Sequence, residues 1–74
     1  MSINVKMRVT EEDAERAANI VTRHGLASKA HAVSEALSLT NFISEAAKEH
    51  GARVVLEYPN GKRERVIKPE LGLN

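Results

Sequence analysis

The chain has no cysteine and no tryptophan, and it contains one phenylalanine and one tyrosine among 74 residues. Disulfides and thiolate metal sites are therefore excluded, and the absence of cysteine fits a reducing compartment. Because so few large side chains are present, one copy of the chain can bury little apolar area. Domains of this size often need a partner subunit to be stable. We therefore expect one small domain that forms an oligomer.

The sequence also lacks a long apolar run. Its N-terminus does not resemble a signal peptide, and no stretch approaches the length of a membrane span, so we expect a cytoplasmic protein without a membrane partner. The net charge is only +1, but the charges are unevenly placed. Lys6 and Arg8 are the only charged side chains before Glu11, and acidic residues then dominate up to Glu15. A basic tip on a near-neutral body favours a small, specific contact with DNA.

No spacing in the sequence predicts catalytic chemistry. A nucleophile with a matching base and a glycine-rich phosphate loop are both missing, so we expect neither an enzyme nor a bound cofactor. His24, His31 and His50 are spaced so that no two of them lie one helical turn apart. We therefore expect no metal site either.

Residues 3–9 alternate between apolar and polar side chains. This period of two predicts a half-buried strand. A lone strand cannot satisfy its main-chain groups, and the next strand-like segment lies far along the chain. A second copy of the chain is therefore the expected pairing partner. The apolar side is Ile3, Val5, Met7 and Val9, and the polar side is Asn4, Lys6 and Arg8.

Two helices are expected next, over residues 11–24 and 29–50, because apolar residues recur there at helical spacing. Asp13 lies three positions after Thr10, which makes a variant of the capping box. The expected N-caps are Thr10 and Ser28, and the expected C-caps are Gly25 and Gly51.

Residues 53–58 and 62–67 are strand-like and flank the turn sequence Pro59-Asn60-Gly61, which predicts a hairpin. Two registers are open. A three-residue turn places Glu57 opposite Arg63, and a two-residue turn places Glu57 opposite Glu64. Opposite charges favour the three-residue turn. The same acids also favour a salt-bridged surface over phosphate contacts by Arg63 and Arg65.

The hairpin needs a surface to pack on, because an isolated hairpin is marginal in water and one of its faces is apolar. Leu39 and Phe42 lie off the main apolar stripe of the 29–50 helix and also need a cover. We expect the hairpin to extend a dimer interface, and the competing hypothesis is a docking site for another protein. The expected organisation is a DNA-binding and dimerisation domain (residues 1–50), a β-hairpin extension (51–68) and a flexible tail (69–74).

Two segments carry a resemblance to a known family. One is Val5-Lys6-Met7-Arg8-Val9 running into Thr10, and the other is Gly25-Leu26 followed by Ser28 to Leu37. Over about residues 3–50 the chain resembles the ribbon-helix-helix (Arc/MetJ/CopG-type) DNA-binding family. The resemblance implies an α+β ribbon-helix-helix fold, in which an intertwined homodimer forms an N-terminal two-stranded antiparallel ribbon. The C-terminal β-hairpin lies outside that family core.

The resemblance also implies which residues contact DNA. The ribbon would enter the major groove and touch base edges with its outward side chains. The start of the second helix would hold a phosphate. The implied residues are Asn4, Lys6 and Arg8 for bases, Ser28, Lys29 and Ala30 for phosphate, and Val5, Met7, Val9, Val33 and Leu37 for the dimer core.

The expected function is sequence-specific binding of double-stranded DNA by a homodimer that acts as a transcriptional repressor. One alternative is the antitoxin of a toxin–antitoxin module that regulates its own operon, with the toxin bound by the C-terminal hairpin. A second alternative is a protein-interaction or dimerisation module that does not bind DNA.

Overall fold

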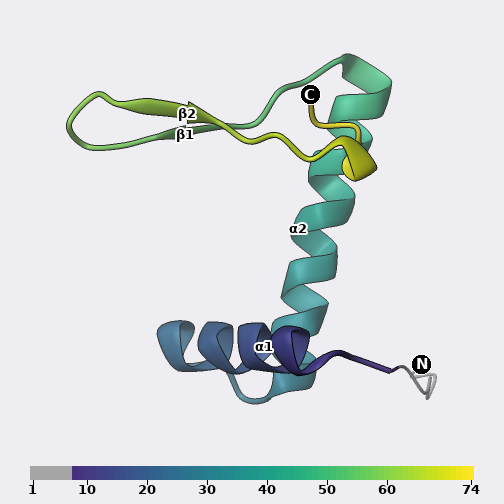
Figure 1. Cartoon of the computed structure of the whole chain (residues 1–74), viewed down its shortest axis with the longest axis vertical. Coiled ribbons are helices and arrows are strands. Elements are labelled where there is room, and N and C mark those ends of the chain that lie inside the picture. The colour runs from purple at the N-terminus through teal and green to yellow at the C-terminus, as the bar shows by residue number, and fades with distance from the viewer. Residues whose placement is uncertain (1–7) are drawn as a thin grey trace. The chain divides into compact units, whose positions relative to one another are not determined.

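The computed structural model describes residues 8–74. Two helices, α1 (Glu11–His24) and α2 (Lys29–His50), precede two strands, β1 (Val55–Glu57) and β2 (Arg63–Arg65), and a short 3-10 helix, η1 (Pro69–Leu71) (Figure 1). The chain divides into an N-terminal unit ending at Ala36 and a C-terminal unit beginning at Leu37, so the division falls within α2. Neither helix of residues 8–74 combines the length and the apolar character needed to cross a membrane.

α1 begins and ends where the capping residues predict. The Thr10 hydroxyl accepts a hydrogen bond from the main-chain N–H of Asp13 at 3.0 Å, which satisfies one of the free donors of the first turn. The Asp13 carboxylate accepts from Arg16 at 2.8 Å, an ion pair within the helix. Gly25 ends the helix with φ +61°, a left-handed conformation that favours glycine. The predicted bounds of this helix are confirmed.

α2 is the longest element, and its predicted bounds are also confirmed. At its start the Ser28 hydroxyl accepts from the N–H of His31 at 3.1 Å. At its end the N–H of Gly51 donates to the Ala47 carbonyl at 3.1 Å, and the N–H of Ala52 donates to the Ala46 carbonyl at 3.2 Å. This pair of bonds satisfies carbonyls that would otherwise lack a donor at the end of the helix.

The C-terminal hairpin has the three-residue turn. Tyr58 pairs with Lys62 through a main-chain bond of 2.8 Å, and Glu57 lies opposite Arg63. Gly61 has φ +88°, as the bulge of such a turn requires. The register that opposite charges favour in the sequence is confirmed. The paired strands are shorter than the strand-like segments that predict them, since three residue pairs form the sheet.

Residues 69–74 contain a short helix and a closed loop, and the flexibility expected of this tail stays a prediction. Pro69–Leu71 forms η1, and Lys68 and Leu73 exchange two main-chain hydrogen bonds of 2.7 and 3.0 Å, which close this segment into a loop. Gly72 lies against Ala47 of α2. Leu73 is buried, so this loop shields one large apolar side chain from water.

The expected ribbon-helix-helix architecture is wrong for this chain. The observed order is two helices followed by a two-stranded antiparallel sheet, and the C-terminal hairpin is the sheet found within residues 8–74. Arg8 and Val9 belong to no strand, and Thr10 leads directly into α1. Alternation predicts which side chains share a face, but a strand also needs a main-chain partner, and residues 8–10 pair with no strand of the described residues. The rest of the predicted strand lies outside the described residues.

The core of the single chain is small. Three apolar residues are buried among residues 8–74: Ala17 and Ala32 in the N-terminal unit and Leu73 in the C-terminal unit. Two of them are alanines, which bury little area each. Most of the larger apolar side chains remain exposed, so the structure of one copy leaves apolar surface that a stable protein would cover.

Candidate nucleic-acid interface

The start of α2 presents main-chain donors. Ser28 satisfies the N–H of His31 with its hydroxyl and that of Ala32 with its carbonyl, each at 3.1 Å. Within residues 8–74 the N–H groups of Lys29 and Ala30 have no hydrogen-bond acceptor. All of these residues except Ala32 are exposed. The segment predicted to hold a phosphate therefore has donors free to do so.

The two helix starts differ in charge. The first turn of α1 carries Glu11, Glu12 and Asp13, whose carboxylates offset the positive end of its helix dipole. The first turn of α2 carries no acidic residue and begins with Lys29. The positive end of α2 is therefore left without a side-chain counter-charge, and it can accept an anion from outside the chain.

The residues predicted to contact bases are only partly described. Asn4 and Lys6 lie outside the described residues. Arg8 is exposed, and within residues 8–74 it makes no ion pair. Its guanidinium has the fork of donors that suits guanine or phosphate, so a role in base contact stays a prediction.

The predicted dimer core is open in the single chain. Val5 and Met7 lie outside the described residues. Val9, Val33 and Leu37 are 60%, 41% and 62% exposed. A dimer interface would cover these side chains, and their contacts with a partner stay a prediction.

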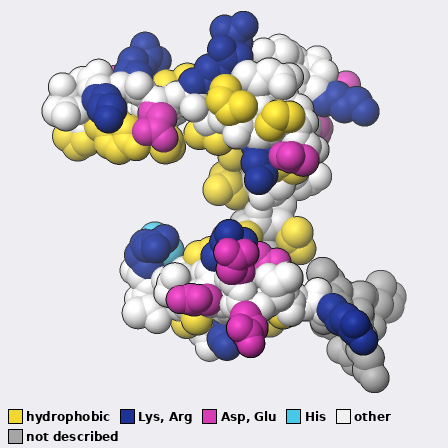
Figure 2. Space-filling view, in the orientation of Figure 1, with side chains coloured by type: hydrophobic (Ala, Val, Ile, Leu, Met, Phe, Trp, Pro, Cys, Tyr) yellow, Lys and Arg dark blue, Asp and Glu magenta, His cyan; other side chains and the backbone are white. Residues whose placement is uncertain are grey.

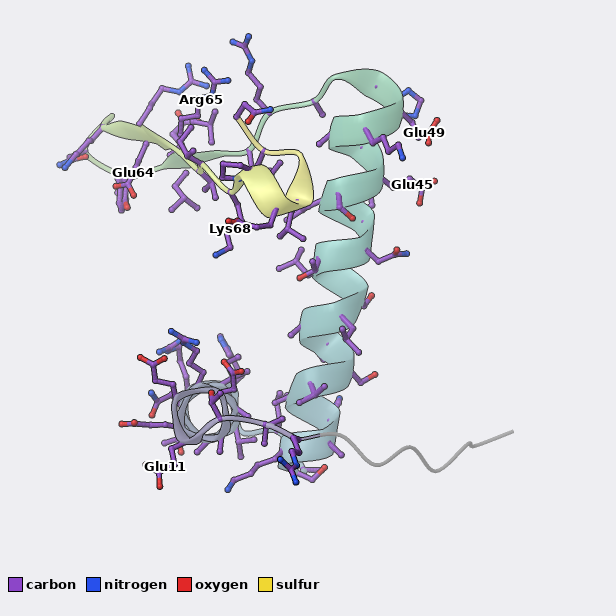
Figure 3. All side chains as sticks on the ribbon, turned by 45° about the vertical axis from the view of Figure 1, so that its right-hand side comes forward. Glu11, Glu45, Glu49, Glu64, Arg65 and Lys68 are labelled. Atoms are coloured by element: carbon purple, nitrogen blue, oxygen red, sulfur yellow. The ribbon has the colours of Figure 1, made fainter. Side chains whose placement is uncertain are left out.

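The hairpin carries a polar contact across its apolar face. The Tyr58 hydroxyl donates a hydrogen bond to the Glu64 carboxylate at 3.3 Å. The negative charge of Glu64 raises the pKa of the Tyr58 hydroxyl above its usual value, and desolvation and the hydrogen bond act in the same direction. The Glu64 carboxylate is therefore the hydrogen-bond acceptor of Tyr58. Figure 3 shows Glu64 on the side of β2 opposite to its neighbour Arg65.

No group of three or more His, Asp or Glu side chains in the described part of the chain is arranged to hold a metal ion. His31 lies 3.6 Å from the Glu35 carboxylate, one turn further along α2. That spacing is the ordinary one for a side-chain pair on a helix surface.

Comparison of the chain with protein-family models, with curated proteins and with solved structures found no match in any of the three.

Proposed function

We propose that this protein is a cytoplasmic, homodimeric, sequence-specific DNA-binding protein that represses transcription by occupying an operator. The observation that carries the proposal is the start of α2. It combines free main-chain donors at Lys29 and Ala30 with a lysine side chain and no acidic residue. Phosphate is the anion that DNA presents at high density, and helix N-termini are a common source of phosphate contacts.

The homodimer is supported by the exposed apolar side chains. Leu39 and Phe42 of α2 are 60% and 69% exposed, although a helix with apolar residues around much of its circumference is normally covered. A second copy of the chain would supply matching apolar surface. Two copies would also double each DNA contact, because a two-fold dimer presents the same residues to two half-sites.

Sequence preference would come from the segment before α1. Phosphate contacts position a protein on the duplex without reading its sequence, so base-edge contacts must come from other side chains. We assign this role to Asn4, Lys6 and Arg8, whose side chains match adenine or guanine edges. This assignment does not depend on a ribbon.

The test begins with selection of bound duplexes from a random pool at two salt concentrations. Lys29→Ala is then compared with the wild type on the selected and on unrelated duplexes. We expect Lys29→Ala to weaken binding to all sequences about equally and to flatten the salt dependence by about 0.9 for each phosphate that is no longer bound. Lys48→Ala, at the other end of α2, is the matched control and should bind as the wild type does.

Two results would contradict the proposal. If the wild type binds no duplex at low salt, DNA binding is wrong. If Lys29→Ala changes the preferred sequence and leaves the salt dependence unchanged, Lys29 contacts bases and the phosphate assignment is wrong.

The exposed apolar face of the hairpin favours a second candidate, an antitoxin whose toxin covers that face. Leu56 and Tyr58 on this face are 46% and 39% exposed. A toxin would form a stable complex with the chain and would leave DNA binding intact. A module that only binds proteins would show no salt-dependent DNA binding, so the same experiment separates it from both DNA-binding candidates.

A further inference from the structure

The hairpin has two chemically different faces. Residues opposite each other in an antiparallel pair lie on the same face, so Leu56 and Glu64 share one face, and the pairs Val55–Arg65 and Glu57–Arg63 share the other. Figure 2 shows hydrophobic side chains along one side of the hairpin and Lys and Arg side chains projecting from the opposite side. Arg63 and Arg65 therefore stand next to each other on the face away from the apolar one.

The expected salt-bridged surface does not form. Glu64, the acid next to Arg63 and Arg65 in sequence, lies on the other face and accepts from Tyr58. Glu57 lies opposite Arg63 in the ladder, yet in the described part of the chain neither Arg63 nor Arg53 makes an ion pair or a side-chain hydrogen bond. Alternation along a strand, which the sequence shows, separates Glu64 from the arginines.

Arg53 lies near Arg65, because both side chains line one hollow at the base of the hairpin. The hollow has a volume of about 230 Å³, and its lining includes Arg53 and Arg65 together with Gly51 and Ala52. Arg65 already donates a hydrogen bond there to the main-chain oxygen of Asn74. Its guanidinium is therefore directed at an oxygen acceptor in the same hollow that Arg53 lines.

The arginine face, defined as Arg53, Arg63 and Arg65, concentrates positive charge. Side chains two residues apart on a strand are about 7 Å apart, which is inside the screening length of about 8 Å at physiological salt. Residues 51–68 contain five basic and two acidic side chains. All three arginines are exposed, and the planar guanidinium fork matches phosphate oxygens better than an ammonium does.

We propose that the arginine face contacts phosphates of the DNA backbone and forms a second anchoring surface in addition to the start of α2. The inference rests on the proposed function and deepens it, because it names a further contact on the same ligand. The contact is independent of base sequence. Protein carboxylates would offer the arginines isolated charges, whereas a duplex offers a continuous row of phosphates to several arginines at once.

The test compares two double variants. Arg53→Gln/Arg63→Gln removes two charges whose side chains have no bonding partner in the described residues, so the fold should persist. The control is Lys48→Gln/Lys62→Gln, which also removes two positive charges from the C-terminal unit. Both lysine side chains are exposed and neither belongs to the arginine face. Binding to a labelled random-sequence duplex is measured by fluorescence anisotropy at about 50 and 200 mM salt, and circular dichroism checks the helix content of each variant.

We expect the arginine variant to bind at least tenfold more weakly at low salt, since one charge-assisted contact is worth roughly tenfold in affinity. The slope of log affinity against log salt should fall by about 0.9 for each phosphate that is no longer bound. The lysine variant should stay within about threefold of the wild type, because only long-range attraction is reduced.

Two outcomes overturn the inference, and they are distinguishable. If the wild type binds the duplex and both variants bind equally well, the arginine face makes no contact and the proposed function stands. If the wild type does not bind the duplex, the proposed function fails and the inference fails with it.

Discussion

The two units of the molecule handle apolar surface differently. In the described N-terminal unit, residues 8–36, the exposed large apolar side chains are Val9 and Val33, and both helix starts have a side-chain cap. The C-terminal unit exposes many more, and it buries one apolar side chain, Leu73. The exposed set of this unit is Leu37, Leu39, Phe42, Val55, Leu56, Tyr58 and Ile67.

This difference indicates where a partner is needed. Local hydrogen bonds can define the helices of the N-terminal unit, since caps and turns need only nearby residues. The C-terminal unit cannot cover Leu39, Phe42 and the apolar face of the hairpin with its own residues. Exposed apolar surface of this kind marks an interaction site, so we expect the C-terminal unit to contribute most of the interface in the proposed homodimer.

The largest effect should come from placing a charge in that interface. We expect Phe42→Asp to abolish the dimer or to prevent folding, because an unpaired carboxylate buried at an interface costs several kcal/mol. On the surface of a monomer the same change would stay within about 0.5 kcal/mol. Mass by sedimentation and the concentration dependence of the thermal midpoint report the result.

Asn41→Asp is the matched control for this prediction. The neighbouring residue lies about 100° around the helix and carries the same new charge, so it should leave mass and melting unchanged. A Phe42→Asp protein with the mass and midpoint of the wild type would show that this face is not an interface. The exposed apolar surface of the C-terminal unit would then not distinguish it from the N-terminal unit as the site of a partner.

A smaller effect should come from the caps of the N-terminal unit. Thr10→Ala removes the hydroxyl that accepts from the Asp13 N–H, and we expect it to lower the free energy of unfolding by about 1 kcal/mol. Thr22→Ala, at an exposed position within the same helix, should leave stability unchanged or raise it slightly, because alanine has the higher helix propensity.

Chemical denaturation at one fixed protein concentration measures both threonine variants, since stability depends on concentration in a dimer. Equal stability of the two variants would mean that the cap of α1 contributes nothing, and that long-range packing defines the N-terminal unit as well.

The smallest effect concerns the ionisation of Tyr58 in the C-terminal unit. Because the Glu64 charge raises the Tyr58 pKa, the phenolate absorbance should appear at a higher pH than for a free tyrosine, whose pKa is about 10. The protonated hydroxyl is the form that the fold favours. Its contribution to stability is therefore complete below the unfolded-state pKa and is lost as pH rises through the higher folded-state pKa.

Glu64→Gln should move the phenolate midpoint back toward the usual pKa, because the amide keeps an acceptor and removes the charge. Glu57→Gln, on the opposite face of the hairpin, should not move the midpoint. The chain has one tyrosine and no tryptophan, so the ultraviolet titration reports this group alone. Identical midpoints in the wild type and Glu64→Gln would contradict the contact between Tyr58 and Glu64.

Several features of the fold could be predicted from neighbouring residues. Thr10, Ser28, Gly25 and Gly51 define the helix ends, since each makes its capping bond or turn with residues a few positions away. The register of the hairpin was predictable because Glu57 and Arg63 lie close to the turn. Opposite charges at these two positions favour one of the two alignments, and that alignment is the observed one.

The N-terminal ribbon could not be predicted in the same way. Alternation in residues 3–9 describes side chains, whereas a ribbon depends on main-chain partners from another strand, and Arg8 and Val9 form no strand in this chain. The salt-bridged surface expected around Arg63 and Arg65 was wrong for a different reason, because alternation along the strand already separates neighbouring side chains. Glu64 adjoins Arg63 and Arg65 in sequence, but it lies on the other side of the sheet.

The sequence alone therefore determined the elements whose bonds are local: α1, α2, their caps and the turn at Pro59-Asn60-Gly61. Only the tertiary structure decided that Leu73 is buried, that Arg53 and Arg65 line one hollow, and that Leu39 and Phe42 stay uncovered in a single chain. The physical reason is distance along the chain. Capping and turn formation depend on residues within a few positions, whereas burial and charge clustering depend on residues that folding brings together.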